Sequence, residues 1–212
     1  KDGQINPTDL TQALAKGARA GGATVLENTK VTDILLDQGK VTGVMVDGSQ
    51  IKADIVVNCT GMWGRDVGAM TKALVPLHAC EHFYVVTDPI EGVHSGLPVL
   101  RDPDNYAYFK EDAGKILLGA FEPEAKPWGM DGIPDDFADG MLRNDMDHFM
   151  PVLERAMTRM PALEHTGIRT WFCGPESFTP DNRYHLGEVP ETKGLFVACG
   201  FNSIGIQSAG GV

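Results

Sequence analysis

Two segments near the ends of the chain share one pattern: an apolar strand, then a glycine turn, then a helix. Residues 54–59 run into Thr60-Gly61 and a helix predicted over about 63–74. Residues 194–198 run into the glycine-rich stretch 200–207 and a short helix of small residues. Near-continuous apolar strands are typical of strands covered on both faces. The pattern predicts a layered α/β domain built from both chain ends, with the two turns side by side at one sheet edge.

The N-terminal region begins with a helix signal. Asn6 precedes a proline at the first helical position, and Gly21-Gly22 ends the helix. Short strands are predicted after it, and polar turns between them favour a meander of hairpins. These strands cover 23–27, 31–37, 40–46 and 50–52.

The middle of the chain is rich in aromatic and β-branched residues, which predicts a mostly antiparallel sheet. Its strands are expected near 82–87, 97–100, 106–111, 116–121 and 170–173. Two helical segments, broken at Pro151, are predicted within 135–160. The fold class is therefore α/β (α+β): residues 1–75 and 186–212 form parts of the layered domain, and residues 76–185 form an antiparallel-sheet domain between them.

Charge and cysteine usage exclude several classes of partner. The net charge is −11, and the 18 Lys and Arg residues are scattered, so nucleic acid and anionic membrane are not expected partners. No apolar run approaches the ~20 residues of a membrane helix. The four cysteines form no Cys-x-x-Cys pair and are expected to be reduced, with Cys59 and Cys199 buried in strands. A reducing compartment such as the cytoplasm is expected.

The glycine turns are the first candidate for chemistry. A glycine between a strand and a helix lets the backbone approach a ligand, and the helix N-terminus favours an anion or an electron-rich ring. The same turn can also serve structure alone. Residue pattern by itself leaves these two interpretations open.

Five motifs, taken together, carry a resemblance to a known family. They appear in family order and extend over nearly the whole chain: NCTGMW (58–63), EHFYVVT (81–87), LPVLRD (97–102), GPESFTPD (174–181) and GFNSIGIQSAGG (200–211). The sequence resembles the FAD-dependent dimethylglycine and sarcosine dehydrogenases, which are D-amino-acid-oxidase-like flavoproteins. One departure is Tyr184, where many members of the family have a proline.

The resemblance implies that the chain is an internal fragment. The family's Gly-x-Gly-x-x-Gly motif, the histidine that binds FAD covalently in several members, and the tetrahydrofolate-binding region that often follows are expected to lie outside it. Alone, the chain is expected to bind FAD weakly or not at all and to be inactive. In a eukaryote the compartment would be the mitochondrial matrix.

The resemblance also implies which residues meet the cofactor. Val31 corresponds to a backbone contact at the adenine end, Gly61 and Trp63 to the flavin region, and 200–206 to the pyrimidine edge of the flavin. A helix N-terminus opening at Ser203 or Ile204 would favour the negative charge of reduced flavin. The residues of this last group are Gly200, Phe201, Asn202, Ser203, Ile204, Gly205 and Ile206. No metal site is expected, because His78 and His82, four residues apart on a strand, are too distant to bind one ion together.

On the substrate side, the resemblance points to His82 and Tyr108 as the catalytic pair. Tyr106 is a rival to Tyr108, because residues two apart on a strand share a face. Without the family, a histidine in a strand is more often structural. Arg101 and Arg169 are candidates to bind a substrate carboxylate.

The implied reaction is hydride transfer from the N-methyl group of dimethylglycine or sarcosine to FAD, an oxidative N-demethylation. An electron-acceptor protein is a possible partner. One alternative is an amine oxidase of the glycine oxidase or D-amino-acid oxidase type. Another is a non-catalytic regulatory paralogue of the same fold.

Overall fold

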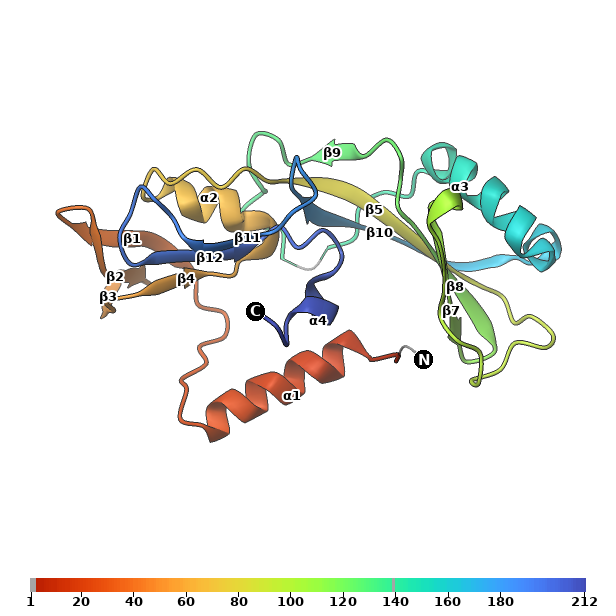
Figure 1. Cartoon of the computed structure of the whole chain (residues 1–212), viewed down its shortest axis with the longest axis horizontal. Helices are drawn as coiled ribbons and strands as arrows, with labels where there is room; N and C mark the ends of the chain where they lie inside the picture. Colours follow the sequence, from red (N-terminus) through yellow and green to blue (C-terminus); the bar gives the residue numbers. More distant parts are fainter. Residues whose placement is uncertain (1–2, 139) are drawn as a thin grey trace. The chain divides into compact units, whose positions relative to one another are not determined.

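The computed structural model describes residues 3–138 and 140–212 and divides the chain into two compact units (Figure 1). Unit 1 contains Cys80–Trp128 and Pro134–Pro175, and unit 2 contains Ile5–Ala79, Gly129–Ile133 and Glu176–Val212. The division falls inside two long strands, β5 (His78–Thr87) and β10 (Ile168–Phe178).

Unit 1 is organised around a six-stranded sheet with the order β10-β5-β8-β7-β6, in which β9 also pairs with β5. The pairs β5/β8, β6/β7 and β7/β8 are antiparallel. The remaining elements of unit 1 are β6 (Leu100–Asp102), η2 (Pro103–Asn105), β7 (Ala107–Asp112), β8 (Lys115–Ala120), β9 (Lys126–Trp128), α3 (Met146–Arg159) and η3 (Pro161–His165).

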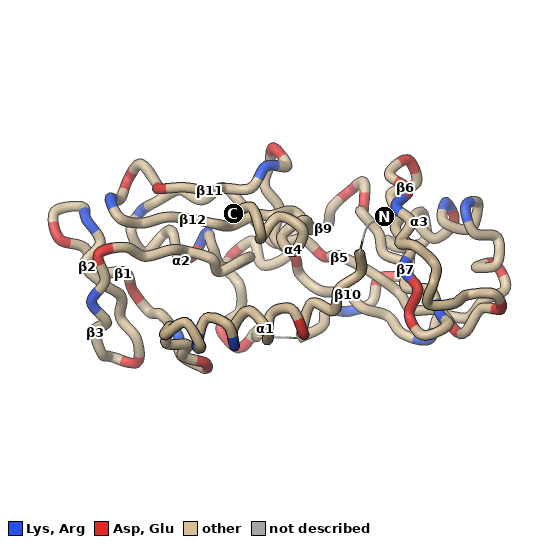
Figure 2. The backbone as a smooth tube through the Cα atoms, turned by 60° about the horizontal axis from the view of Figure 1, so that its bottom comes forward, with Lys and Arg blue, Asp and Glu red and all other residues tan. Residues whose placement is uncertain are grey.

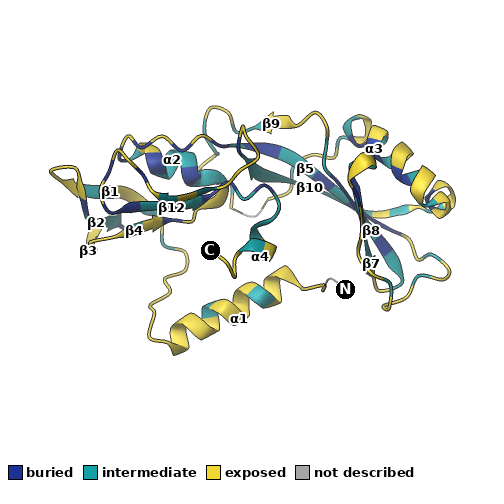
Figure 3. Cartoon of the chain, in the orientation of Figure 1, coloured by how far each residue is buried: buried dark blue, intermediate teal, exposed yellow. Residues whose placement is uncertain are grey.

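The two faces of this sheet differ because side chains alternate along each strand. Phe83 of β5, Phe109 of β7 and Leu118 of β8 belong to one apolar core cluster with Phe149 and Val152 of α3. We call this the helix-packed face. The face turned away from α3, which we call the open face, carries Arg101, Tyr108, Gly119 and Tyr84 in one row across β6, β7, β8 and β5. Figure 3 shows how burial is distributed along these strands.

Unit 2 contains two three-stranded sheets, β1-β2-β3 and β11-β12-β4. Within the second sheet β12 runs parallel to β4 and antiparallel to β11. The helices and strands of unit 2 are α1 (Pro7–Ala20), β1 (Val31–Asp37), β2 (Lys40–Val46), β3 (Ser49–Lys52), β4 (Val56–Asn58), η1 (Gly61–Trp63), α2 (Gly64–Ala69), β11 (His185–Glu188), β12 (Leu195–Cys199) and α4 (Gly205–Ser208).

The predicted fold class is confirmed: helices and sheets are mixed, and an antiparallel sheet occupies the middle of the chain. The capping prediction is also confirmed, because the Asn6 side chain accepts hydrogen bonds from the backbone N–H groups of Thr8 and Asp9. Basic and acidic residues are interspersed along the chain, as Figure 2 shows.

Several local predictions were wrong. Residues 23–27 form no strand, and Val25 and Leu26 are exposed there. A strand needs a hydrogen-bonded neighbour, and none pairs with this segment among the described residues. The apolar run 54–59 is not covered on both faces, because Ile55 and Val57 are exposed. Cys59 is exposed as well, whereas Cys199 is buried as expected.

The helix predictions also need correction. The helix that follows Trp63 ends at Ala69, because the chain turns through Lys72 at a φ of 64°. The region 135–160 contains one helix in its described part, and Pro151 lies inside it rather than at a break. Proline removes one helical hydrogen bond. Burial of Phe149, Val152 and Ala156 in the core keeps α3 continuous across this position.

Candidate functional site

The open face of unit 1 brings Tyr108 against a glycine on the neighbouring strand. Tyr108 of β7 pairs with Gly119 of β8, and a Cβ atom on Gly119 would lie 1.8 Å from Cζ of the Tyr108 ring. The tyrosine ring therefore occupies the space that any other residue at 119 would fill. On the other side of Gly119 lies Tyr84 of β5, whose ring stacks on Phe172 with centroids 4.4 Å apart.

Phe121 is the centre of a polar and aromatic group on this face. Its ring centroid lies 5.5 Å from that of His82 and 5.8 Å from that of Tyr108. The Arg101 guanidinium carbon lies 4.4 Å from the centroid of the same ring, within range of a cation–π interaction. The structure thus brings together three sequence-predicted residues, His82, Tyr108 and Arg101, around Phe121.

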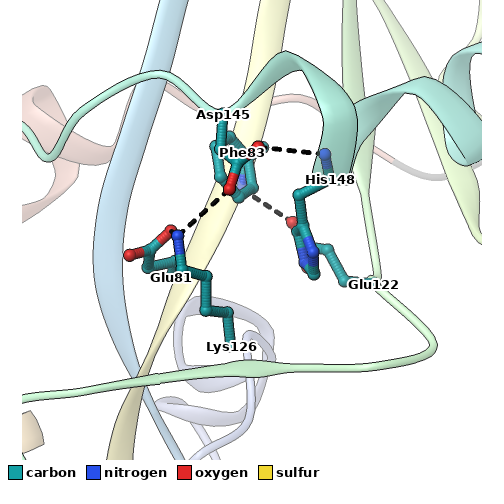
Figure 4. Close-up of polar contacts among 6 residues, drawn as sticks. All are labelled: Glu81, Phe83, Glu122, Lys126, Asp145 and His148. Atoms are coloured by element: carbon teal, nitrogen blue, oxygen red, sulfur yellow. Dashed lines mark hydrogen bonds and ion pairs between the residues drawn. The ribbon is translucent and has the colours of Figure 1, made fainter.

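His82 is held by a carboxylate that sequence reasoning missed. The His82 Nδ1 atom lies 3.0 Å from Glu122 Oε2, and only 5% of the Glu122 side chain is exposed. The other carboxylate oxygen accepts the backbone N–H of Phe83 at 2.9 Å. Burial alone would raise the pKa of Glu122, but the hydrogen bond and charge of His82, with backbone N–H groups, outweigh it and lower the pKa. Figure 4 shows Glu122 beside Phe83.

Glu122 directly follows the predicted strand 116–121, but the sequence does not reveal that this strand pairs with the strand of His82. Only the pairing of β5 with β8 brings positions 82 and 122 together. A second ion pair nearby joins the largely buried Glu81 to the half-exposed Lys126 at 3.2 Å, and Lys126 also bonds Asp145, the cap of α3, at 3.0 Å (Figure 4).

Tyr106 does not share the face of Tyr108, contrary to the sequence expectation. It precedes β7 with a left-handed φ of 56°, so strand alternation does not extend to it. Its ring lies under the Arg155 guanidinium of α3, 5.0 Å from the ring centroid. The Tyr106 backbone carbonyl accepts the Phe121 N–H at 2.8 Å, whereas it is the ring of Tyr108 that lies beside the Phe121 ring.

Arg169 lies apart from the Phe121 group. It lines a separate open hollow of about 410 Å³ with Tyr84, Phe172 and Lys115. Burial and the charge of Asp112 raise the pKa of Tyr84 at this hollow. The two candidate arginines, Arg101 and Arg169, therefore lie at different parts of the sheet.

In unit 2 the two glycine turns lie side by side, as predicted. The parallel pairing of β4 with β12 aligns Asn58 with Val197, and the Cys199 thiol donates to the Asn58 carbonyl oxygen at 3.1 Å. The buried Asn58 side chain donates to the carbonyl of Gly64 and accepts from the Thr60 hydroxyl, which fixes the first turn. Gly61 has a φ of 58°, and no atom lies within 4 Å of where its Cβ would be.

The second turn is fixed by Asn202. Its buried amide accepts the backbone N–H of Thr179 at 2.9 Å and donates to the carbonyl of Gly200 at 2.8 Å. Gly200 has a φ of 71°, and a Cβ there would lie 2.4 Å from the Thr179 methyl group. Asn202 and Ser203 are also left-handed, with φ values of 49° and 64°.

The remaining candidates of this turn are placed as follows. Phe201 stacks on Tyr184 with centroids 4.8 Å apart, so the residue that departs from the family pattern packs directly on the turn. The Ser203 hydroxyl bonds to the carboxylate of Glu176. The predicted helix is present: it spans Gly205–Ser208 and includes Ile206, and Ile204 is its N-cap.

Val31 is the first residue of β1, and Trp63 is the last residue of η1; both are half-buried. Among the described residues, no group of three or more His, Cys, Asp or Glu side chains is arranged to hold a metal ion. None of the described helices is long and apolar enough to cross a membrane.

With this geometry in hand, the comparisons with known proteins identify the family. The family model described as FAD dependent oxidoreductase matches residues 1–212. The chain is 41% identical to human mitochondrial sarcosine dehydrogenase over 99% of its length and 41% identical to 4-methylaminobutanoate oxidase (formaldehyde-forming) of Paenarthrobacter nicotinovorans over 100%. It is 38% identical to the mouse mitochondrial pyruvate dehydrogenase phosphatase regulatory subunit over 100% of its length.

The chain covers 23%, 26% and 24% of these three relatives, so it spans about a quarter of the curated proteins it matches. Among solved structures, L-proline dehydrogenase from P. horikoshii matches with a TM-score of 0.81 at 26% identity, over 98% of this chain and 53% of that one. Glycine oxidase from Geobacillus kaustophilus matches with a TM-score of 0.72 at 28% identity, over 97% and 51%. The chain belongs to the FAD-dependent oxidoreductase family.

Proposed function

We propose that the complete protein is a flavin-dependent enzyme that oxidises the N-methyl group of an N-methylated amino acid such as sarcosine or dimethylglycine. The observation that carries this proposal is the Phe121 group on the open face of unit 1, where a histidine, a tyrosine and an arginine meet. An amino-acid substrate needs a base or hydrogen-bond acceptor for its amine and a cation for its carboxylate, and this group supplies both.

Each residue of the group has a role in the proposal. His82 accepts the proton of the substrate ammonium, because a C–H bond loses hydride readily only beside a neutral amine. Arg101 binds the carboxylate, since a guanidinium makes paired hydrogen bonds with it. Tyr108, fixed against Gly119, orients the substrate. Arg169, in its separate hollow, is not assigned to substrate binding.

The glycine turns of unit 2 fit a flavin edge. Gly61 leaves open space beside its backbone, and buried asparagines hold both turns in place. The left-handed residues of these turns allow the backbone to approach a ligand closely. FAD, when bound, supplies the hydride acceptor. We assign residues 1–75 and 186–212 to the cofactor side, with Val31, Gly61, Trp63 and 200–206 near it, and residues 76–185 to the substrate side.

The relatives support this proposal and its alternatives. Sarcosine dehydrogenase and a formaldehyde-forming methylamino oxidase both act, by their names, on N-methylated amines. The match to glycine oxidase supports an amine oxidase as the alternative reaction. The 38% identity to a regulatory subunit favours a second candidate, a non-catalytic paralogue. A tetrahydrofolate site and an electron-acceptor protein would belong to the complete protein, and the mitochondrial relatives favour the matrix if it is eukaryotic.

The test is anaerobic mixing of the complete, FAD-containing protein with sarcosine, dimethylglycine, 4-methylaminobutanoate, glycine or a D-amino acid. Flavin absorbance is recorded after each addition. Bleaching by N-methylated substrates alone supports the proposal. Bleaching by glycine or a D-amino acid favours the oxidase alternative, and bound FAD that no substrate reduces favours the regulatory paralogue.

A further inference from the structure

The contact between His82 and Glu122 determines which ring nitrogen of His82 carries a proton. An ionised carboxylate only accepts hydrogen bonds, so a proton must lie on His82 Nδ1 across the 3.0 Å contact. The ring nitrogen that carries the proton is set by the partner of the other nitrogen. In the neutral ring, Nε2 is then the nitrogen that can accept a proton.

Glu122 is itself rigidly placed. Its side chain is 5% exposed, and one oxygen accepts the Phe83 backbone N–H while the other faces His82. The hydrogen bonds that its two oxygens accept, from the Phe83 N–H and from His82, favour the ionised form against the effect of burial and lower the pKa of Glu122. A fixed, ionised carboxylate behind an imidazole both orients the ring and stabilises the imidazolium formed when Nε2 takes a proton.

The alternative is a purely structural role, in which Glu122 only fixes the end of β8 against β5. The Phe83 N–H bond alone would serve that purpose, and it needs one oxygen and no charge. The second oxygen, however, is directed to the histidine that shares the ring contact with Phe121. A structural anchor does not require this second contact.

We infer that Glu122 is the positioning residue of His82: it keeps the proton on Nδ1 and directs the basic Nε2 toward the substrate amine. This inference rests on the proposed function for the role of His82, but the ring state itself can be measured without substrate. The proton that His82 takes leaves the substrate ammonium, and the resulting imidazolium is paired with the Glu122 carboxylate.

The first experiment measures the ring state in the complete holoprotein. Histidine is labelled with ¹⁵N, and the His82 signals are assigned by their loss in His82→Asn. Wild type should show the tautomer protonated at Nδ1. Glu122→Gln should shift the ring toward protonation at Nε2, because its amide oxygen can keep the Phe83 bond while its NH₂ donates to Nδ1. Glu122→Asp, which keeps the charge, should retain the wild-type tautomer.

Glu81→Gln is the matched control. Glu81 is the residue before His82, it is also largely buried, and its carboxylate pairs with Lys126. This change should leave the His82 signals and the flavin reduction rate unaltered. A wild-type His82 protonated at Nε2, or equal shifts in the Gln variants at 81 and 122, would overturn the inference.

The second experiment is a double-mutant cycle on the rate of flavin reduction. Glu122→Gln should slow reduction roughly tenfold and His82→Ala about a hundredfold, and the double variant should be no slower than His82→Ala. If the slowing in the double variant equals the product of the two single effects, Glu122 acts independently of His82, and the positioning role is refuted. If His82→Ala leaves reduction unchanged, the proposed function of His82 fails, while the ring-state result still decides the inference about Glu122.

Discussion

The two faces of the six-stranded sheet in unit 1 are made by alternate residues of the same strands, yet they have opposite characters. On the helix-packed face, Phe83 and Leu118 are fully buried against α3. On the open face, their strand neighbours His82 and Gly119 belong to a polar and aromatic group that no core packing explains. One strand thus carries stability on one side and proposed chemistry on the other, and substitutions should separate the two.

The largest expected effect is on stability from the helix-packed face. Phe83→Ala removes a fully buried ring that lies 6.4 Å from Phe149, measured between centroids, and should lower the free energy of unfolding by about 3–5 kcal/mol. Tyr84→Ala, one residue later on the open face, should cost roughly 1 kcal/mol. Urea unfolding of the complete protein, followed by circular dichroism, measures both. Equal losses would contradict the division between the faces.

Gly119→Ala should do the reverse and impair function more than stability. The new methyl group would overlap the Tyr108 ring, so the ring must leave its position. We expect flavin reduction by substrate to slow about tenfold, with little change in unfolding free energy. Gly174→Ala is the control, because its Cβ would meet no atom within 4 Å. If both variants reduce flavin at the wild-type rate, Tyr108 does not orient the substrate.

A smaller effect is expected at low pH. The folded state lowers the pKa of Glu122, so the stability that its carboxylate contributes is complete above about pH 4.5 and is lost as pH falls through the lower folded pKa. Cys80, Cys173 and His82 lie in the electrostatic surroundings of this carboxylate. Between pH 7 and 3, unfolding midpoints of Glu122→Gln should therefore change less than those of wild type. If the unfolding midpoints of wild type and Glu122→Gln change in parallel with pH, the surroundings of Glu122 do not lower its pKa in the folded state.

The smallest effect concerns thiol reactivity. Burial, with the charges of Glu81 and Glu122, raises the pKa of Cys173 in the helix-packed core to about 12, whereas Cys59 is exposed. A thiol with so high a pKa carries almost no thiolate at neutral pH. In the folded chain of residues 1–212, iodoacetamide should therefore label Cys59 first, as mass spectrometry before unfolding can show. Labelling of Cys173 before unfolding would mean that the core opens readily.

Much of this organisation could be predicted from sequence. Apolar runs, turn residues and the Asn6 cap indicated the helices and most strands, because these signals are local. The motif resemblance indicated His82 and Tyr108. The left-handed Tyr106 and the continuous helix through Pro151 were missed, because tertiary packing decides them. Glu122 was missed because its meaning depends on the pairing of β5 with β8, a contact across 40 residues.

The most direct test of the account is His82→Ala in the complete protein, with two quantities measured on the same sample. One is the FAD content after purification, and the other is the rate of flavin reduction by the best N-methylated substrate without oxygen. Because His82 belongs to the substrate face and not to the glycine turns, we predict full FAD content and a roughly hundredfold slower reduction. Equal loss of FAD and of reduction, or a wild-type rate with FAD retained, would contradict the account.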